Sequence, residues 1–354
     1  MNRLFQKRFF SRLAALSMTG LILIASSGCG LSPASLTTTS GHVLPGPVTD
    51  EDIQFVWGND VKDAALKLIQ NSRNEVYVDM YELSDPDVIK ALSDARRRNV
   101  DVRVVLDETE KHSTEVGYPE LRQAGVTVKQ ISIKRGIDHV KMIIADDGVL
   151  IGGMNFGSNS WANNDASVVI SHPSNGFKSM FLWDFERANG QAAQAPTVSA
   201  PLVYDHSIQT AVLAAVQQAQ HSIDMEAFDL SDRDVINALQ TAVKRGTAVE
   251  ILVDPTQSYN RTAVETLRNA GAMVRYYRPY SGELMHAKII DVDHGATFII
   301  GSANFSHQAF TYNHEADVVL HNVSKFDSSF RQDLQTGMAR GSDYPVKAKS
   351  NSWE

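Results

Sequence analysis

The chain has 354 residues and a mass of 38.9 kDa, a length that suits about two ordinary domains. Hydrophobic residues make up 43% and charged residues 21%, a globular composition that excludes a disordered or fibrous protein. The net charge of −8 argues against a protein that coats nucleic acid with a broad basic surface. A single cysteine, Cys29, excludes an intramolecular disulfide and a zinc site built from cysteines.

Residues 1–28 have the pattern of an export signal. Basic residues are followed by an apolar run, 13–25, that is too short for a comfortable membrane-spanning helix. Small residues at 26–28 then precede Cys29, a sequence that resembles the lipobox of bacterial lipoproteins. We therefore expect an exported protein whose Cys29 is lipidated and holds it on a membrane of the bacterial cell envelope. The alternative is cleavage beside residues 25–28 and release of a secreted protein.

Residues 29–50 are rich in Ser, Thr, Pro and Gly and show no apolar period. This composition predicts a flexible, lipidated tether between the membrane and the globular part. Removal of residues 1–28 takes away four basic side chains, so the net charge changes from −8 to −12 in the mature chain.

An internal repeat divides the rest of the chain. The sequence LSDPDVIKAL at 83–92 recurs as LSDRDVINAL at 230–239, a shift of 147 residues. This period is far longer than the roughly 20–50 residues of solenoid repeats, so it indicates a duplicated domain. We predict one domain over 51–198 and a second over 199–345, with the boundary in the Ala-, Gln- and Pro-rich stretch from 190 to 201.

Strand and helix signals alternate along each copy. In the first copy they predict, in chain order, a strand at 76–83, a helix capped by Ser84 and Asp85 that runs to about 98, a strand at 102–107, a helix near 118–124, a strand from 126, a hairpin of 139–145 with 149–153, and a closing helix at 177–190. The alternation predicts an α/β fold with a central sheet.

Each copy carries a histidine and a lysine two positions apart on a predicted strand. Residues two apart on a strand point to the same side, so His139 projects with Lys141, and His286 with Lys288. An aspartate follows each histidine by seven residues (Asp146 and Asp293). Because seven is odd, we expect these aspartates on the opposite face, in a structural role. Further on come asparagines and acidic residues: Asn155, Asp165, Asn304 and Glu315.

These paired motifs resemble the signature of the phospholipase D superfamily, H-x-K-x4-D followed by G-S/G-x-N, and the resemblance covers about residues 52–340. It implies two tandem α-β-α sandwich domains related by a pseudo-twofold axis, with the active site at their interface. It also implies metal-free cleavage of a phosphodiester through a phosphohistidine, without a cofactor. Because one chain supplies both motifs, we expect a monomer with a pseudo-dimeric core.

The resemblance also implies roles for the site residues. By the tendency of the family, His139 is the nucleophile and His286 the general acid. Lysines and asparagines hold the phosphoryl oxygens, and acidic residues orient the imidazoles: Lys141, Lys288, Asn155, Asn304, Asp165 and Glu315. Three further residues are assigned to substrate binding: Ser302, Arg275 and Arg278. His307 and His314 flank the second motif, and we expect incidental surface roles for both.

The two copies differ in two respects near their motifs. Gly153 stands where the second copy has Ser302, and His139 precedes its asparagine by 16 residues where His286 precedes its own by 18. The substrate class remains open at this level. The main expectation is hydrolysis of phospholipid head groups. The alternatives are an exported endonuclease acting on nucleic acid and a phosphatidyltransferase similar to cardiolipin synthase.

Overall fold

The computed structural model describes residues 52–146 and 148–346. The expected signal peptide, the tether and the lipidation site Cys29 lie outside the described residues. Within the described ranges, no helix combines the length and the apolar character needed to cross a membrane.

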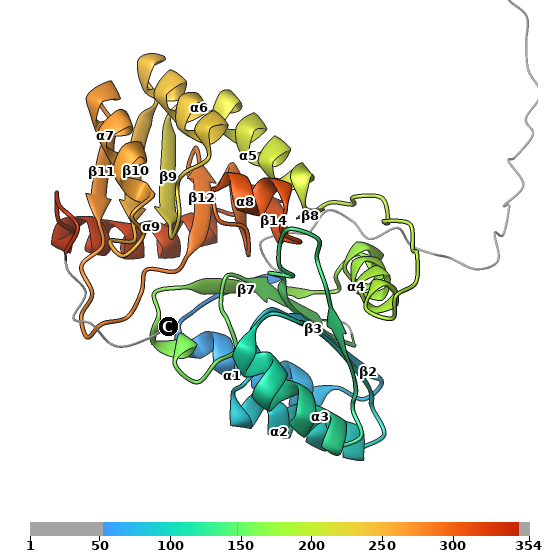
Figure 1. The fold of residues 1–354 in the computed structure, drawn as a ribbon. Helices are drawn as coiled ribbons and strands as arrows, with labels where there is room; N and C mark the ends of the chain where they lie inside the picture. Colours follow the sequence, from blue (N-terminus) through green and yellow to red (C-terminus); the bar gives the residue numbers. More distant parts are fainter. Residues whose placement is uncertain (1–51, 147, 347–354) are drawn as a thin grey trace, which may run out of the picture. The chain divides into compact units, whose positions relative to one another are not determined.

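The chain forms two seven-stranded mixed sheets with the same strand order (Figure 1). The first is ordered β1-β7-β6-β5-β2-β3-β4, and the second, from the equivalent edge, β8-β14-β13-β12-β9-β10-β11. In each sheet three neighbouring strands run parallel: β2, β3 and β4 in the first, and β9, β10 and β11 in the second. The first strand of a β-hairpin pairs antiparallel with β2 in the first sheet and with β9 in the second. The predicted pair of α/β domains is therefore confirmed.

The strands of the first sheet are β1 (Ile53–Trp57), β2 (Glu75–Met80), β3 (Asp101–Asp107), β4 (Thr127–Ile131), β5 (Lys141–Ala145), β6 (Gly148–Gly152) and β7 (Ala166–Ser171). Those of the second are β8 (Leu202–Tyr204), β9 (Ser222–Ala227), β10 (Ala248–Val253), β11 (Met273–Tyr276), β12 (Lys288–Val292), β13 (Thr297–Gly301) and β14 (Ala316–His321). The α-helices are α1 (Asn59–Asn71), α2 (Pro86–Arg97), α3 (Tyr118–Gln123), α4 (Asn175–Arg187), α5 (His206–Gln218), α6 (Arg233–Lys244), α7 (Asn260–Ala270), α8 (His307–Thr311) and α9 (Ser324–Arg340).

The repeat is visible in the helix caps as well as in the sheets. The Asp85 carboxylate accepts hydrogen bonds from the backbone N–H groups of residues 87 and 88, and Asp232 does the same for residues 234 and 235. Such caps satisfy backbone donors that a helix leaves unpaired at its start. The same local sequence thus starts the same helix in both copies, after β2 and after β9.

One hydrophobic core joins the two copies. Helices α1–α3 pack on the outer face of the first sheet and α5–α7 on the outer face of the second, each with its own cluster of buried side chains. A third cluster draws on both sheets, with Phe55 of β1 lying 5.7 Å from Phe298 of β13 and 5.2 Å from Phe326 of α9 between ring centroids. This shared core fixes the copies against each other and so positions the site between them.

Candidate active site

The two motif histidines are held by the backbone of the opposite copy. His139 lies two residues before the start of β5, and its N–H donates to the carbonyl of His314 at 2.8 Å. His286 lies two residues before β12, and its N–H donates to the carbonyl of Asn164 at 2.8 Å. Each histidine therefore lies in a connection whose backbone is hydrogen-bonded to the opposite copy.

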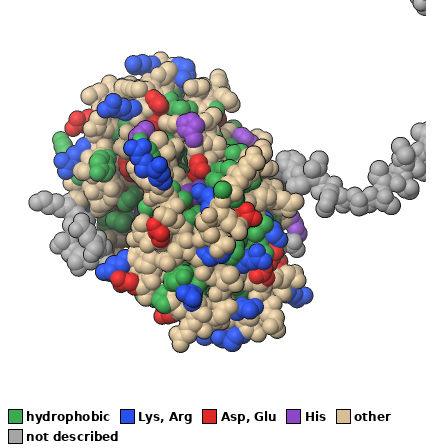
Figure 2. Space-filling model, turned by 45° about the vertical axis from the view of Figure 1, so that its right-hand side comes forward, with side chains coloured by type: hydrophobic (Ala, Val, Ile, Leu, Met, Phe, Trp, Pro, Cys, Tyr) green, Lys and Arg blue, Asp and Glu red, His purple; other side chains and the backbone are tan. Residues whose placement is uncertain are grey.

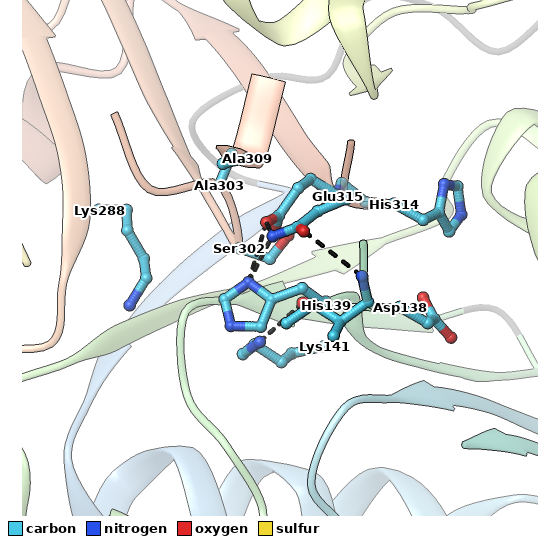
Figure 3. Close-up of polar contacts among 12 residues, drawn as sticks. Asp138, His139, Lys141, Lys288, Ser302, Ala303, Ala309, His314 and Glu315 are labelled. Carbon is cyan, nitrogen blue, oxygen red and sulfur yellow. Dashed lines mark hydrogen bonds and ion pairs between the residues drawn. The ribbon is translucent and has the colours of Figure 1, made fainter. Parts of the chain in front are cut away.

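The side chain of each histidine also contacts a carboxylate of the opposite copy. His139 Nδ1 lies 2.9 Å from Glu315 Oε2 (Figure 3). His286 Nδ1 lies 2.6 Å from Asp165 Oδ2. The sequence predicted these carboxylates as imidazole partners without saying which partner belongs to which histidine. A proton on Nδ1 that is donated to the carboxylate leaves the Nε2 lone pair of each ring available for reaction.

Both lysines of the motifs are almost completely buried. Lys141 is 3% exposed and Lys288 1%. Lys141 Nζ donates to the backbone carbonyl of His139 at 2.7 Å, and Lys288 Nζ donates to that of His286. Burial lowers the pKa of Lys141 to about 7 and that of Lys288 to about 8, although the site carboxylates oppose the shift.

The environment also lowers the pKa of both imidazoles. Burial, aided by the charge of Lys288 and opposed by Asp165, lowers the pKa of His286 to about 4. Burial lowers the pKa of His139 as well, since Lys141 adds to it and Glu315 offsets only part. Both rings are therefore neutral at neutral pH in this structure. The expectation of one charged imidazole requires the negative charge of a bound phosphodiester, which favours protonation.

The four basic side chains share one space. Lys288 lowers the pKa of His139 through its charge, and Lys141 does the same to His286, so each lysine lies within electrostatic range of the other copy's histidine. Figure 3 shows Lys288 reaching from the second copy toward the space beside the His139 ring. Two imidazoles, one of them protonated when a phosphodiester is bound, and two ammonium groups can attack, protonate and neutralise one phosphoryl group.

The two asparagines follow the hairpins at equivalent positions. Asn155 comes three residues after the end of β6, and Asn304 three residues after the end of β13. The side-chain oxygen of each is buried and has no hydrogen-bond partner among the described residues. Buried amides that the protein leaves unsatisfied are groups that can meet a ligand.

The exchange of Gly153 for Ser302 is matched by the acidic residue opposite. In the second copy, Ser302 Oγ donates to Glu315 Oε2 at 2.6 Å and accepts from the backbone N–H of Ala316 at 2.9 Å. In the first copy, a Cβ at position 153 would overlap the Asp165 carboxylate. The shorter Asp165 therefore lies close against a glycine, and the longer Glu315 is supported by a serine.

The difference in spacing lies away from the site. Strand β5 ends at Ala145 and β6 begins at Gly148, whereas β12 ends at Val292 and β13 begins at Thr297. The two additional residues of the second copy thus belong to the hairpin turn, at the end of the strands opposite to the histidines.

The turn aspartates have one structural arrangement in both copies. Asp146 accepts hydrogen bonds from the backbone N–H groups of residues 73–75, and Asp293 from those of residues 220–222, at 2.7–3.0 Å. Both lie beyond the strand end with positive φ, 46° and 53°. Their position in the turn, and not the alternation of a strand, directs them away from the histidines and toward the starts of β2 and β9.

Two residues assigned to substrate form hydrogen bonds within the protein. Ser302 is completely buried and both its hydrogen bonds serve the Glu315 region, so it is a positioning residue. Arg275 donates to the carbonyl of Met338 at 2.8 Å and pairs with Asp343, at the edge strand β11. Both side chains form hydrogen bonds within the protein, and the assignment of these residues to substrate stays a prediction. Arg278 lines a cavity beside Asn164.

An aromatic ring lies against each histidine, a feature that the sequence analysis did not identify. The Tyr81 ring lies 5.1 Å from that of His139, and the Phe228 ring 4.7 Å from that of His286, between centroids. Positions 81 and 228 are related by the same shift of 147 residues as the motifs. The repeat therefore held the signal that could have identified them.

His314 has a buried role and not the surface role expected. It is 2% exposed, and its imidazole contacts Asp205 through Nδ1 at 2.7 Å and Asp184 through Nε2 at 3.1 Å. These two carboxylates raise its pKa well above the ordinary value despite burial, so it is charged. The equivalent residue on the other side is Asn164, which donates to Asp333 at 2.9 Å.

Metal-binding groups are not gathered in the described part of the chain. Within residues 52–146 and 148–346, no three His, Cys, Asp or Glu side chains are arranged to hold a metal ion.

Comparisons with known proteins place this geometry in a family. The family described as "Cardiolipin synthase, PLD-like domain" matches residues 65–187 and 212–336, which together make up well over half of the chain and include both motifs. Cardiolipin synthase 1 of Staphylococcus aureus (strain MRSA252) is 20% identical over 327 residues, covering 79% of this chain and 65% of that protein. The chain therefore spans somewhat less than two thirds of the length of that relative.

Other matches are shorter or structural. Phospholipase D of Rickettsia bellii is 32% identical over 103 residues, covering 29% of this chain and 51% of that protein. The crystal structure of phosphatidylserine synthase from Haemophilus influenzae Rd KW20 has a TM-score of 0.67 at 16% identity, covering 86% of this chain and 90% of that one, and so shares the fold. With both copies matched, the chain belongs to the cardiolipin synthase, PLD-like domain family of the phospholipase D superfamily.

Proposed function

We propose that the protein is a phosphatidyltransferase that joins two molecules of phosphatidylglycerol into cardiolipin and releases glycerol. The observation that carries the choice is the match to cardiolipin synthases along both copies, beyond the superfamily motifs alone. This match favours the transfer alternative over the hydrolysis of phospholipid head groups, which was the main expectation from the sequence. The charge distribution supports a lipid over nucleic acid, since Figure 2 shows acidic and basic side chains interspersed on the face it presents.

The first half of the proposed reaction cleaves the donor lipid. His139 Nε2 attacks the phosphorus, the bond from phosphorus to the glycerol oxygen breaks, and His286 gives its proton to that oxygen. Negative phosphate between the rings raises the pKa of His286, so that the ring can carry the proton. Lys141 and Lys288 neutralise the phosphoryl oxygens, and Glu315 stabilises the cationic phosphohistidine that forms.

The second half returns the enzyme to its starting state. A hydroxyl of a second phosphatidylglycerol gives its proton to neutral His286 and attacks the phosphorus. The bond between phosphorus and His139 breaks, and cardiolipin leaves. Water in place of the hydroxyl would give phosphatidic acid, so the identity of the second nucleophile alone separates transfer from hydrolysis.

The purified protein incubated with phosphatidylglycerol vesicles tests this proposal. Mass spectrometry of the lipids and an assay of free glycerol measure the products, and a His139→Ala variant provides the blank. We expect cardiolipin and glycerol in equal amounts. Phosphatidic acid with glycerol and no cardiolipin would assign hydrolysis, and cleavage of plasmid DNA without lipid turnover would assign a nuclease; either result would refute the proposal.

A further inference from the structure

A cavity of about 330 Å³ adjoins the site on the His286 side. Its wall includes aromatic, basic and acidic side chains: Tyr277, Tyr280, Arg278, Arg340, Glu283 and Asp333, together with Asn164. The wall meets the site directly, because the carbonyl of Asn164 accepts the N–H of His286 and the next residue, Asp165, holds the imidazole. A molecule in this cavity would therefore lie beside the residues that hold His286.

The repeat does not by itself account for this cavity. Nine residues separate β11 from His286, whereas seven separate β4 from His139, and α9 has 17 residues where α4 has 13. On the His139 side, the Arg187 guanidinium of α4 lies 3.7 Å from the centroid of the Trp183 ring and pairs with Asp184. Its counterpart in α9 is the small Thr336, which lines the cavity.

The arginines of the cavity have capacity to bind an anion. No carboxylate in the described ranges forms an ion pair with Arg278 or Arg340, and Nη1 of Arg340 is buried without a partner there. The Arg340 guanidinium lies over the Tyr280 ring, 3.0 Å from its centroid, which fixes its direction.

The carboxylates of the cavity are bound by the protein itself. Glu283 accepts from the Tyr277 hydroxyl at 2.9 Å and from the backbone N–H of Ser281 at 2.8 Å. Asp333 accepts from the Asn164 amide at 2.9 Å. The negative groups are therefore engaged by the wall, whereas the two guanidinium groups bind no carboxylate in the described ranges. Nη2 of Arg340 donates to the carbonyl of Arg278 at 3.3 Å, and Nη1 of Arg340 has no partner there.

We infer that this cavity binds the phosphodiester of the acceptor lipid, so that the enzyme selects an alcohol that carries its own phosphate. The inference rests on the proposed transfer reaction. In phosphatidylglycerol the reacting hydroxyl and the phosphate are separated by one glycerol unit. A phosphate held by Arg278 and Arg340 beside Asn164 directs that hydroxyl toward His286, which takes its proton. Planar guanidinium groups suit phosphate oxygens well.

Acceptor competition in the purified protein tests the inference. Phosphatidylglycerol is the donor, and the soluble acceptors are glycerophosphoglycerol, which carries a phosphodiester, and glycerol, which does not. We expect the ratio of kcat/KM for the two acceptors to fall roughly tenfold or more in R278Q and in R340Q, because each loses a charge-assisted hydrogen bond. K134Q, which removes an exposed lysine from the shorter loop of the first copy, is the control and should keep the wild-type ratio. An unchanged ratio in the double variant R278Q/R340Q would overturn the inference.

Calorimetric titration separates this inference from the proposed function. If the wild-type protein transfers to no acceptor, the transferase proposal fails, and binding of glycerophosphoglycerol still tests the cavity. Weaker binding in R278Q/R340Q than in K134Q would support a subsite for phosphodiesters. Absence of binding to the wild type, or equally tight binding of inorganic phosphate, would overturn it, since a head-group subsite gains contacts from the glycerol.

Discussion

The two sides of the site are built from the same repeat, yet one is filled and the other is hollow. Beside His139, the charged His314 is buried between Asp184 and Asp205. Beside His286, Asn164 occupies the equivalent position and a cavity lies next to it. In both copies the same strands and hairpins hold the reacting groups, so these groups are arranged symmetrically. The residues around them differ between the copies, and the two sides can therefore have different functions.

The carboxylates that orient the imidazoles also differ between the two copies, each together with the residue it packs against. Asp165 requires the glycine at 153, and Glu315 uses the serine at 302. Neither partner can be exchanged alone without losing space or a hydrogen bond. Gly153 and Asp165 therefore depend on each other in one copy, and Ser302 and Glu315 in the other. Each pair as a whole orients its histidine.

The largest effect should come from removing either imidazole. His139→Ala and His286→Ala should each lower kcat by roughly 10³-fold or more, and the double variant little further, since the two act as a unit. Denaturation during turnover of phosphate-labelled donor should show a covalent phosphoprotein in His286→Ala and none in His139→Ala. His307→Ala, at an exposed position of α8, is the control. Normal turnover by His286→Ala would refute the pairing.

Exchange of the small residue opposite each carboxylate sharpens the comparison. Gly153→Ser should lower kcat/KM by about 10- to 100-fold, because the new Cβ displaces Asp165 and with it the His286 ring. Ser302→Gly should cost less, since Glu315 keeps its contact with His139 and loses only the hydroxyl. Steady-state kinetics of the two variants measure this. Equal losses in both would contradict the account.

The lysines predict how activity changes at alkaline pH. The pKa values of Lys141 and Lys288 are about 7 and about 8, so both ammonium groups lose their charge as the pH rises through this range. We expect kcat/KM to fall by roughly 10²-fold or more between pH 7 and pH 9, with circular dichroism as the check that the fold persists. Constant kcat/KM up to pH 10 in a folded protein would show that these lysines keep their protons.

The filled side should matter for stability more than for catalysis. His314→Asn introduces the residue found at the equivalent position beside His286. It leaves Asp205 without its cation and Asp184 with Arg187 alone, which should lower the free energy of unfolding by about 3 kcal/mol. The folded pKa of His314 lies well above 6.5, so its contribution is complete below pH 6.5 and is lost as the pH rises through the folded value.

Denaturant unfolding of the two proteins at pH 6 and at alkaline pH measures this. The difference in unfolding free energy should shrink as the pH rises, while most of the activity is retained at pH 6, because the backbone bond to His139 does not depend on the side chain at 314. A difference that is the same at every pH would contradict a charged His314.

Much of the fold and of the site could be predicted from local sequence. The repeat predicted two similar α/β domains, and the motif spacing placed His139 with Lys141 and His286 with Lys288. Such predictions succeed because a cap, a strand alternation and a hairpin depend on residues close together in the chain. The hydrogen bonds that Ser302 and Arg275 form within the protein could not be predicted, because burial and internal partners are not readable from residue type.

The sequence by itself determined which residue types the site contains, since duplicated motifs specify two imidazoles, two ammonium groups and two carboxylates. Only the tertiary structure decided the pairing of His139 with Glu315 and His286 with Asp165, across 176 and 121 residues of chain. It also decided which side holds a buried imidazolium and which a cavity. The physical reason is that these features arise where the two sheets pack through a common core, and contacts between residues so far apart in the chain have no local signature.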